Sequence, residues 1–303
     1  MPIHLYIEQY FQQHPAARKT GIGVKNPPLE KRPKVFHIEN KLVNVGNTQV
    51  PIRIYTPNED KNHPLFIFFH GGNFIPGGLE SHDVSCRMIS SVTGYKVIAV
   101  DYCSKGTDEK LMLNHCYFVT NWIIENVKQL GGLSDHIAIG GPSVGAHFAT
   151  TIVLDFIMKG KFPFFKQILH YPILQFDHDV RNSPHISRAL FNGKYGIDLT
   201  LHPLDLSNLK NASLSYYAPL YAKKEHLAKM PKTLIFIAEY DPLFDEGELY
   251  AEKLKKAGVE VKLVRFDGNI HGFLQNFPGS PDYMRGYDIT AEFLMNGIPQ
   301  FVT

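Results

Sequence analysis

HIAIGGPSVGAHFATTIVLDFIM, residues 136–158, is the stretch that decides the fold. It opens with a short strand-like run and closes with 146–158, which is apolar nearly all round, as a buried central helix would be. Between them, Gly141, Ser143 and Gly145 have the spacing G-x-S-x-G. A strand, a tight turn and a helix lift such a serine above a sheet, and a Cβ at either glycine would collide with a neighbouring strand or helix. The spacing alone also fits a glycine-rich turn whose serine has no catalytic role. The neighbouring sequence must distinguish these two interpretations.

Unbroken apolar runs recur on both sides of this stretch. Runs of this length fit strands that are covered on both faces, as in a parallel sheet. They are LFIFF (65–69), KVIAV (96–100), QILHYPI (167–173) and TLIFIA (233–238). VEVKLVRF (259–266) is also strand-like, although charged residues interrupt it. A β-hairpin is expected at 41–57, with its turn at Gly46-Asn47.

Helical patterns lie between these runs. A short amphipathic helix is expected at 3–13, and 246–257 has Glu252 and Lys256 as an i,i+4 pair, with Gly258 to end the helix. In 111–130, apolar residues three or four apart share one face: Cys116, Val119, Ile123, Val127 and Leu130. Strands that alternate with helices predict a doubly wound α/β sheet with helices on both faces.

The alternation breaks between about 175 and 225. This region is richer in polar residues, proline and histidine, and it lies between two strands. We therefore expect a single domain, 1–303, in which 1–40 and about 175–225 form a cap. Sites on such sheets lie at the carboxyl ends of the strands, where a cap would shape a pocket.

Composition excludes several classes of protein. The formal charge of +2 over 303 residues includes no basic block, so no nucleic-acid partner is expected. Three cysteines do not make a disulfide framework, which indicates a reducing compartment. We find neither a signal peptide nor the roughly 18 apolar residues of a spanning helix. The sequence therefore predicts a soluble, cytoplasmic protein with no integral membrane segment.

A serine nucleophile needs a base and an orienting acid. Asp241 directly follows the run TLIFIA, and His271 directly follows VEVKLVRF in DGNIHGF. Both are expected at carboxyl ends of strands, on the same edge as Ser143, and the order Ser, Asp, His is that of α/β-hydrolases. Alone, His271 would be a loop histidine and Asp241 a helix N-cap. Asp245 and Glu246 are alternative candidates for the acid. Asp241 is favoured, because the other two lie four and five residues later, inside the expected helix.

Acyl transfer also needs donors for an oxyanion. HGGNF (70–74) follows the run LFIFF and exposes backbone N–H groups. The expected donors are the amides of Gly71, Gly72 and Val144, the last being the residue after the nucleophile. The side chain of His70 is expected to anchor this loop rather than to move protons.

These motifs together resemble the hormone-sensitive-lipase-like group of α/β-hydrolases, the bacterial esterase family with HGGGF and GDSAG motifs. The resemblance implies an eight-stranded, mostly parallel sheet with a helical cap, Ser143 as nucleophile, Asp241 as acid and His271 as base. The similar stretches are HGGNFIPGGLESHD (70–83), VIAVDY (97–102), HIAIGGPSVGA (136–146), YAPLYA (217–222), AEYDPLFDEGELYAEKLKKAGVEV (238–261) and NIHGFLQNF (269–277).

The chain departs from this family at several positions. Asn73 replaces the third glycine, Pro142 replaces the Asp before the nucleophile, and Val144 replaces the usual Ala. CSKGT (103–107) stands where the family has RLAPE. The chain is thus identified as a divergent member. HGG-x-aromatic and SxGAH also resemble kynurenine-formamidase-like hydrolases, which keeps amide substrates open.

Other candidate residues have simpler explanations. Cys103 is expected to be packing rather than a reactive thiol. FDHD (176–179) with His185 is expected to be a solvated loop, because it lacks metal-ligand spacing. Three phenylalanines fit an acyl pocket or core packing equally well: Phe74, Phe148 and Phe244.

The sequence therefore predicts a serine hydrolase, specifically a carboxylesterase for short or medium acyl or aryl esters. Its partner would be a small-molecule ester, and no metal or organic cofactor is required. The alternatives are an amidase or formamidase-like hydrolase and a non-catalytic small-molecule receptor on the same fold. Homodimers that pair through a sheet edge occur in the family, so a homodimer remains open.

Overall fold

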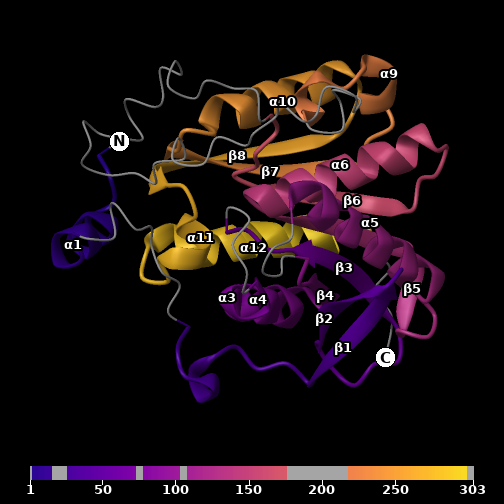
Figure 1. Cartoon of the computed structure of the whole chain (residues 1–303). Helices are drawn as coiled ribbons and strands as arrows, with labels where there is room; N and C mark the ends of the chain where they lie inside the picture. The colour runs from indigo at the N-terminus through magenta and orange to yellow at the C-terminus, as the bar shows by residue number, and fades with distance from the viewer. Residues whose placement is uncertain (1, 16–25, 73–77, 103–107, 176–217, 299–303) are drawn as a thin grey trace.

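The computed structural model describes residues 2–15, 26–72, 78–102, 108–175 and 218–298, and an eight-stranded sheet lies at its centre (Figure 1). The strand order is β1-β2-β4-β3-β5-β6-β7-β8. β1 and β2 form an antiparallel hairpin, β2 is antiparallel to β4, and the remaining pairs are parallel. The strands are β1 His37–Val45, β2 Thr48–Thr56, β3 His63–Phe69, β4 Lys96–Val100, β5 Gly132–Pro142, β6 Phe164–His170, β7 Lys232–Tyr240 and β8 Val261–Ile270. The predicted hairpin and parallel sheet are confirmed.

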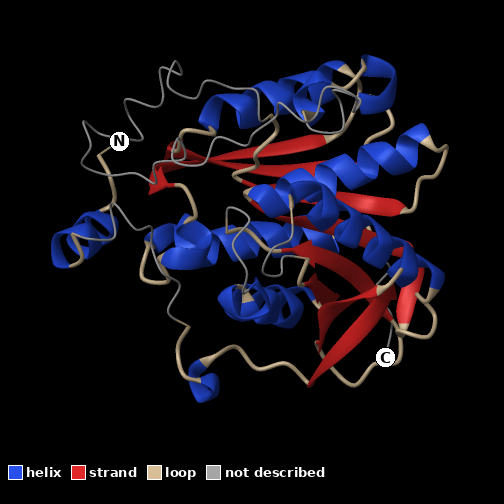
Figure 2. Ribbon diagram, in the orientation of Figure 1, coloured by secondary structure: helices blue, strands red, loops and turns tan. Residues whose placement is uncertain are grey.

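Helices cover both faces of this sheet (Figure 2). They are α1 Leu5–Gln13, α3 Gly78–Ser81, α4 Asp83–Thr93, α5 Glu109–Glu125, α6 Val144–Met158, α9 Lys224–Leu227, α10 Phe244–Lys256, α11 Phe273–Asn276 and α12 Pro281–Met295, with 3₁₀ turns η1 Leu29–Lys31 and η6 Pro219–Tyr221. Within the described residues, none of the helices has the length and apolar character that crossing a membrane requires.

The unbroken apolar strands are explained by two separate cores. In β3, Leu65 and Ile67 pack on the face that carries α5, α6 and α10. Phe66 and Phe68 pack on the opposite face, against residues of α4 and α12. Successive side chains of a strand point to opposite faces, so a strand buried on both sides must be apolar at every position.

Two predicted boundaries were wrong. The helix expected over 111–130 ends at Glu125, and a turn with Gly131 at φ 65° leads into β5. The strand expected over 167–173 ends at His170, because Tyr171 has φ 39° and leaves the extended conformation. The expected pair of Glu252 and Lys256 is present at 3.0 Å.

The N-terminal segment packs beside the carboxyl end of β8. α1 buries Ile7 and Phe11, and the ring of Tyr10 meets Phe277 edge-on at 5.4 Å. The other expected cap element falls mainly on 176–217, outside the described residues. The cap and the single-domain boundaries therefore stay predictions.

A buried carboxylate fixes the start of α4. Asp83 is 1% exposed and accepts hydrogen bonds from Arg32 (2.6 Å), Arg87 (2.7 Å), Tyr55 (3.0 Å) and Arg53 (3.3 Å). Burial acts to raise the pKa of Asp83, but the hydrogen bonds from Arg32 and Arg87 outweigh it, so its pKa lies below the usual range. The cluster ties α4 to the N-terminal segment and to β2.

We expect Asp83→Asn to lower the free energy of unfolding by about 3–5 kcal/mol, because it leaves buried guanidinium groups without their carboxylate. Since the folded-state pKa is depressed, the stabilisation by Asp83 is present above its unfolded-state pKa and is lost as the pH falls through the folded-state value. Urea unfolding at neutral pH and at a series of pH values below about 4 measures both effects. Glu252→Gln, which breaks an exposed pair, is the control and should change stability by less than about 1 kcal/mol. Equal effects of the two substitutions would contradict the prediction.

Candidate active site

Ser143 occupies a strained turn between β5 and α6. Its φ of 55° and ψ of −120° are unfavourable for a residue with a Cβ. A Cβ built on Gly141 or on Gly145 would lie 2.0 Å from the carbonyl oxygen of Phe69. The turn is thus pressed against the end of β3, and only glycine fits on either side of the serine. This is the close packing expected from G-x-S-x-G.

Pro142 does not disturb this turn. It is the last residue of β5 and pairs in register with His170 of β6. The next amide, that of Ser143, donates to the carbonyl of His170 at 2.9 Å. A residue without an N–H is therefore tolerated here, because the strand pairing resumes one position later.

The three residues expected from the sequence meet at the carboxyl ends of their strands. His271 follows β8, and Asp241 follows β7. His271 Nε2 lies 3.0 Å from Ser143 Oγ, and His271 Nδ1 lies 2.8 Å from Asp241 Oδ2. All three are buried, Asp241 most completely at 1% exposure. The geometry allows the serine to donate to the histidine and the histidine to donate to the aspartate.

A second hydrogen bond orients the aspartate. Asp241 Oδ1 accepts from the amide of Leu243 at 2.8 Å, while Oδ2 faces His271. An ionised carboxylate is only an acceptor, so Nδ1 of His271 must carry the proton and Nε2 must present its lone pair to Ser143. Asp241 is therefore the partner of the histidine, and the alternative role as a helix N-cap is wrong, because Leu243 is the N-cap residue of α10.

The alternative acid Glu246 points elsewhere. Its carboxylate accepts from the amides of Leu174 (2.6 Å) and Gln175 (3.1 Å), in the segment after β6. Burial raises the pKa of Glu246 to about 8. The structure brings Asp241, and not Glu246, to the histidine.

The expected oxyanion donors fall into two groups. The amide of Gly71 already donates to Nε2 of His82 at 3.3 Å, so it is free for a substrate only if that bond opens. Gly72 has φ 120°, a conformation suited to glycine, and Val144 is the first residue of α6. Among the described residues, neither the Gly72 amide nor the Val144 amide has an acceptor.

His70 anchors the donor loop, as expected. Its ring stacks on Tyr102 at 4.1 Å, its Nδ1 donates to the carbonyl of Gly71 at 2.6 Å, and the Tyr102 hydroxyl donates to the His70 carbonyl at 2.7 Å. Burial lowers the pKa of His70 to about 4. The imidazole is therefore neutral in the folded protein and serves as a packed support.

Sequence reasoning missed two residues at this site. Tyr171 directly follows β6, and its ring meets the ring of His271 edge-on at 5.0 Å. Tyr171 and Ser143 are the two non-glycine residues with positive φ in the described part of the chain. His82 is buried against the donor loop. The signal for His82 was available in the similar stretch 70–83, of which only the first residues received roles.

Several other candidates lie outside the described residues: Asn73, Phe74, Cys103, His185 and the stretch 176–179. Phe148 and Phe244 belong to the core, with Phe148 edge-on to Tyr102 at 4.8 Å. Within the described ranges, no three His, Cys, Asp or Glu side chains gather as they would around a metal ion.

An eight-stranded, mostly parallel sheet with a serine on a strained turn between a strand and a buried helix defines the α/β-hydrolase class. A family model described as alpha/beta hydrolase fold matches residues 66–275. The chain therefore belongs to this family, and its resemblance to the hormone-sensitive-lipase-like esterases, as a divergent member, is confirmed.

Several known proteins similar to this chain are esterases by name. An arylesterase from Saccharolobus solfataricus is 31% identical over 264 residues, covering 84% of this chain and 82% of that protein. The carboxylesterase NlhH from Mycobacterium tuberculosis is 28% identical over 267 residues, covering 83% and 79%. A solved hyperthermophilic esterase from Pyrobaculum calidifontis superposes with a TM-score of 0.82 at 25% identity, over 97% of this chain and 98% of that one.

Proposed function

We propose that the protein is a carboxylesterase that cleaves short or medium acyl or aryl esters through Ser143, His271 and Asp241. The observation that carries the proposal is the unbroken chain of contacts from Ser143 Oγ to His271 Nε2 (3.0 Å) and from His271 Nδ1 to Asp241 Oδ2 (2.8 Å). The names of the similar arylesterase and carboxylesterase support esters as the substrate class.

Acylation begins when Ser143 Oγ attacks the ester carbonyl carbon and passes its proton to His271 Nε2. Asp241 stabilises the resulting imidazolium through Nδ1–H. The tetrahedral intermediate collapses, the C–O bond to the alcohol breaks, and His271 returns the proton to the leaving oxygen. A water molecule then loses a proton to His271 and attacks the acyl-enzyme, which releases the carboxylic acid and restores Ser143.

The negative charge that develops on the carbonyl oxygen needs donors aimed at it. Gly72 and Val144 supply the amides that are free of acceptors within the described residues. Val144 also begins α6, whose N-terminus carries a partial positive charge. Removing one such donor typically costs about 10²–10³ in kcat.

The receptor alternative expects a serine that no longer engages a base. The 3.0 Å contact between Ser143 and His271 favours the enzyme instead. Amide substrates would use the same nucleophile and base, so the ester preference must be measured with matched substrates.

We expect a fluorophosphonate probe to label the wild-type protein at Ser143, because the oriented histidine activates this hydroxyl. Mass spectrometry of the labelled peptide identifies the position. Ser91, an exposed serine of α4, gives the control: Ser91→Ala should be labelled like the wild type. Matched p-nitrophenyl esters and p-nitroanilides then separate esterase from amidase. Failure to label, or a label on another serine, would refute the proposal, whereas faster anilide turnover would favour an amidase.

A further inference from the structure

We infer that His82 is a positioning residue for the oxyanion loop: its ring holds the amide of Gly71 and leaves the amide of Gly72, one residue later, for the substrate. The inference rests on the proposed function. His82 lies in the last part of the stretch 70–83, and no residue of that part belongs to the triad or to the anchor formed by His70.

A directed chain of hydrogen bonds supports this role. Gly71 N–H donates to His82 Nε2 at 3.3 Å, and His82 Nδ1 lies 2.8 Å from Ser81 Oγ. The Ser81 hydroxyl donates onward to the carbonyl of Gly78 at 3.1 Å, so its lone pair accepts from Nδ1–H. Only the neutral ring with its proton on Nδ1 satisfies all three bonds.

The surroundings favour that neutral ring. His82 is 2% exposed and packs 5.7 Å from the ring of Phe68 and 5.9 Å from the ring of His70. Burial lowers the pKa of His82 well below its usual value, and the neighbouring His70 lowers it further. An imidazolium would have no lone pair for Gly71, so the neutral state is the one that can hold the loop.

His82 does not cap its own helix. It is the N-cap residue of α4, yet its side chain makes no capping hydrogen bond. A capping Ser, Thr, Asp or Asn here would stabilise the helix relative to a residue that does not cap. The ring instead reaches across to the loop after β3, which indicates that holding this loop is what the position does.

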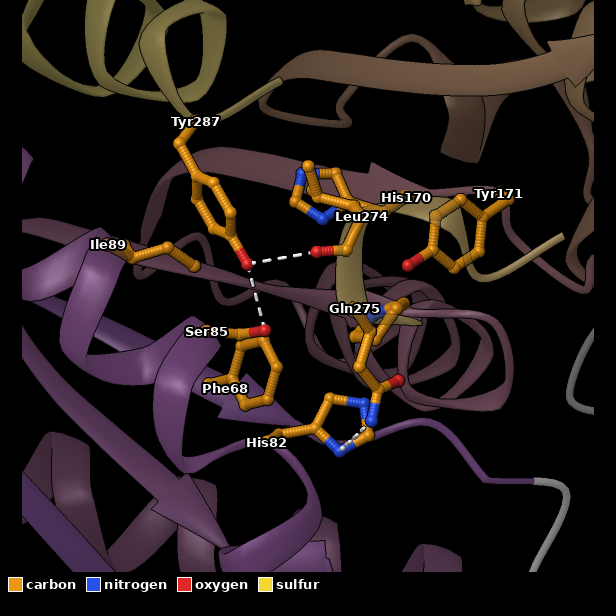
Figure 3. A pocket seen from close by; sticks show the side chains of 10 residues that line it. Phe68, His82, Ser85, Ile89, His170, Tyr171, Leu274, Gln275 and Tyr287 are labelled. Atoms are coloured by element: carbon orange, nitrogen blue, oxygen red, sulfur yellow. Dashed lines mark hydrogen bonds between the residues drawn. The ribbon is translucent and has the colours of Figure 1, made fainter. Parts of the chain in front are cut away.

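The segment that carries the base is joined to this side of the oxyanion loop through Ser81, the residue before His82, and not through the ring, whose Nδ1–H cannot accept a hydrogen bond. Gln275 lies in α11, shortly after His271, and its side-chain amide donates to the Ser81 carbonyl at 3.0 Å and lies 3.4 Å from His82 Nδ1. Figure 3 shows the side chain of Gln275 directed at His82. Both residues line a small cavity of about 10 Å³, which Pro142 also lines. His82 thus sits where the donor loop, the serine turn and the histidine segment meet.

Two substitutions separate the effect of losing the hydrogen-bond acceptor for Gly71 from the effect of losing the imidazole ring. In His82→Gln, Oε1 is as many bonds from Cα as Nε2 is, so it keeps an acceptor for Gly71. In His82→Asn, Oδ1 reaches only the place of Nδ1, and the acceptor for Gly71 is lost. We expect His82→Asn to lower kcat for p-nitrophenyl acetate by about 10²-fold with KM changed less than about threefold, as for a small misplacement of a catalytic group. His82→Gln should stay within about fivefold of the wild type in kcat, since it restores the bond.

Affinity for a trifluoromethyl ketone, which forms a tetrahedral adduct with the serine, should fall in parallel with kcat in His82→Asn. Thermal unfolding of both variants gives the folding control: because Asn can cap α4 and Gln cannot, the midpoint of His82→Asn should be no lower than that of His82→Gln, so a loss of kcat confined to His82→Asn does not reflect unfolding. Wild-type turnover in His82→Asn would overturn the inference, as would equal losses of kcat in both variants. A wild-type protein whose ester turnover does not depend on Ser143 would instead overturn the proposed function, and the inference with it.

Discussion

Ser143→Ala is expected to lower kcat for p-nitrophenyl acetate by about 10⁵–10⁶-fold, the scale on which loss of a nucleophile acts in a triad. Without Oγ no acyl-enzyme forms, and the 3.0 Å contact to His271 Nε2 has no proton to transfer. The remaining activity comes from the oxyanion donors and from substrate binding. Steady-state hydrolysis at saturating substrate, corrected for the uncatalysed rate, measures the loss.

Ser143→Gly shows whether such a loss reflects chemistry rather than unfolding. The serine holds φ at 55°, where any residue with a Cβ is strained, and glycine adopts this conformation freely. The glycine variant should therefore be as inactive as the alanine variant but at least as stable, with a gain of roughly 1 kcal/mol if the strain is released. Turnover near the wild-type level in either variant would exclude Ser143 as the nucleophile.

The sheet could be predicted from sequence because its central strands are buried on both faces. KVIAV is β4 residue for residue, and every position from Val97 to Val100 packs against one core or the other. Ser143, Asp241 and His271 could be placed together for a related reason. Each follows a strand, and the carboxyl ends of parallel strands meet at one edge of a sheet.

The errors arose where tertiary contacts override local pattern. Val127 and Leu130 keep the helical spacing of 111–130, but the chain turns after Glu125 and still packs both against the core. The sequence also did not predict that the amide of Gly71 donates to His82, eleven positions away. His82 directly precedes Asp83, whose buried hydrogen bonds tie the start of α4 to the N-terminal segment and to β2. Apolar periodicity contains no information about such a contact.

Pro142 illustrates how a departure from a family motif acquires a physical meaning. Its lack of an N–H costs nothing in the pairing of β5 with β6, because Ser143 donates to His170 instead. Its side chain faces the small cavity that His82 also lines, where the family motif has a carboxylate. A hydrocarbon wall is compatible with the neutral His82 ring that Gly71 requires. The departure therefore places an apolar side chain, and no charge, in the cavity that the His82 ring lines.

Asp241→Asn is expected to lower kcat by about 10⁴-fold with little loss of stability, the effect of placing the wrong histidine tautomer in a triad. The amide of Leu243 donates to Oδ1 at 2.8 Å and will hold the oxygen of an asparagine at that position. The NH₂ group then faces His271 Nδ1, which must accept. The proton of His271 moves to Nε2, so the ring can no longer take a proton from Ser143.

Glu246→Gln is the matched control. Glu246 is the alternative acid, and it lies in α10, the helix that begins three residues after Asp241. Its substitution keeps an acceptor for the amides of Leu174 and Gln175, so kcat should change less than about threefold. Kinetics of both variants with one ester, together with their unfolding midpoints, decide between the two carboxylates. A large loss in Glu246→Gln alongside a nearly intact Asp241→Asn would move the acid role to Glu246. The structure leads us to expect the reverse, since only Asp241 has an oxygen within hydrogen-bond distance of His271 while its other oxygen is held by the backbone.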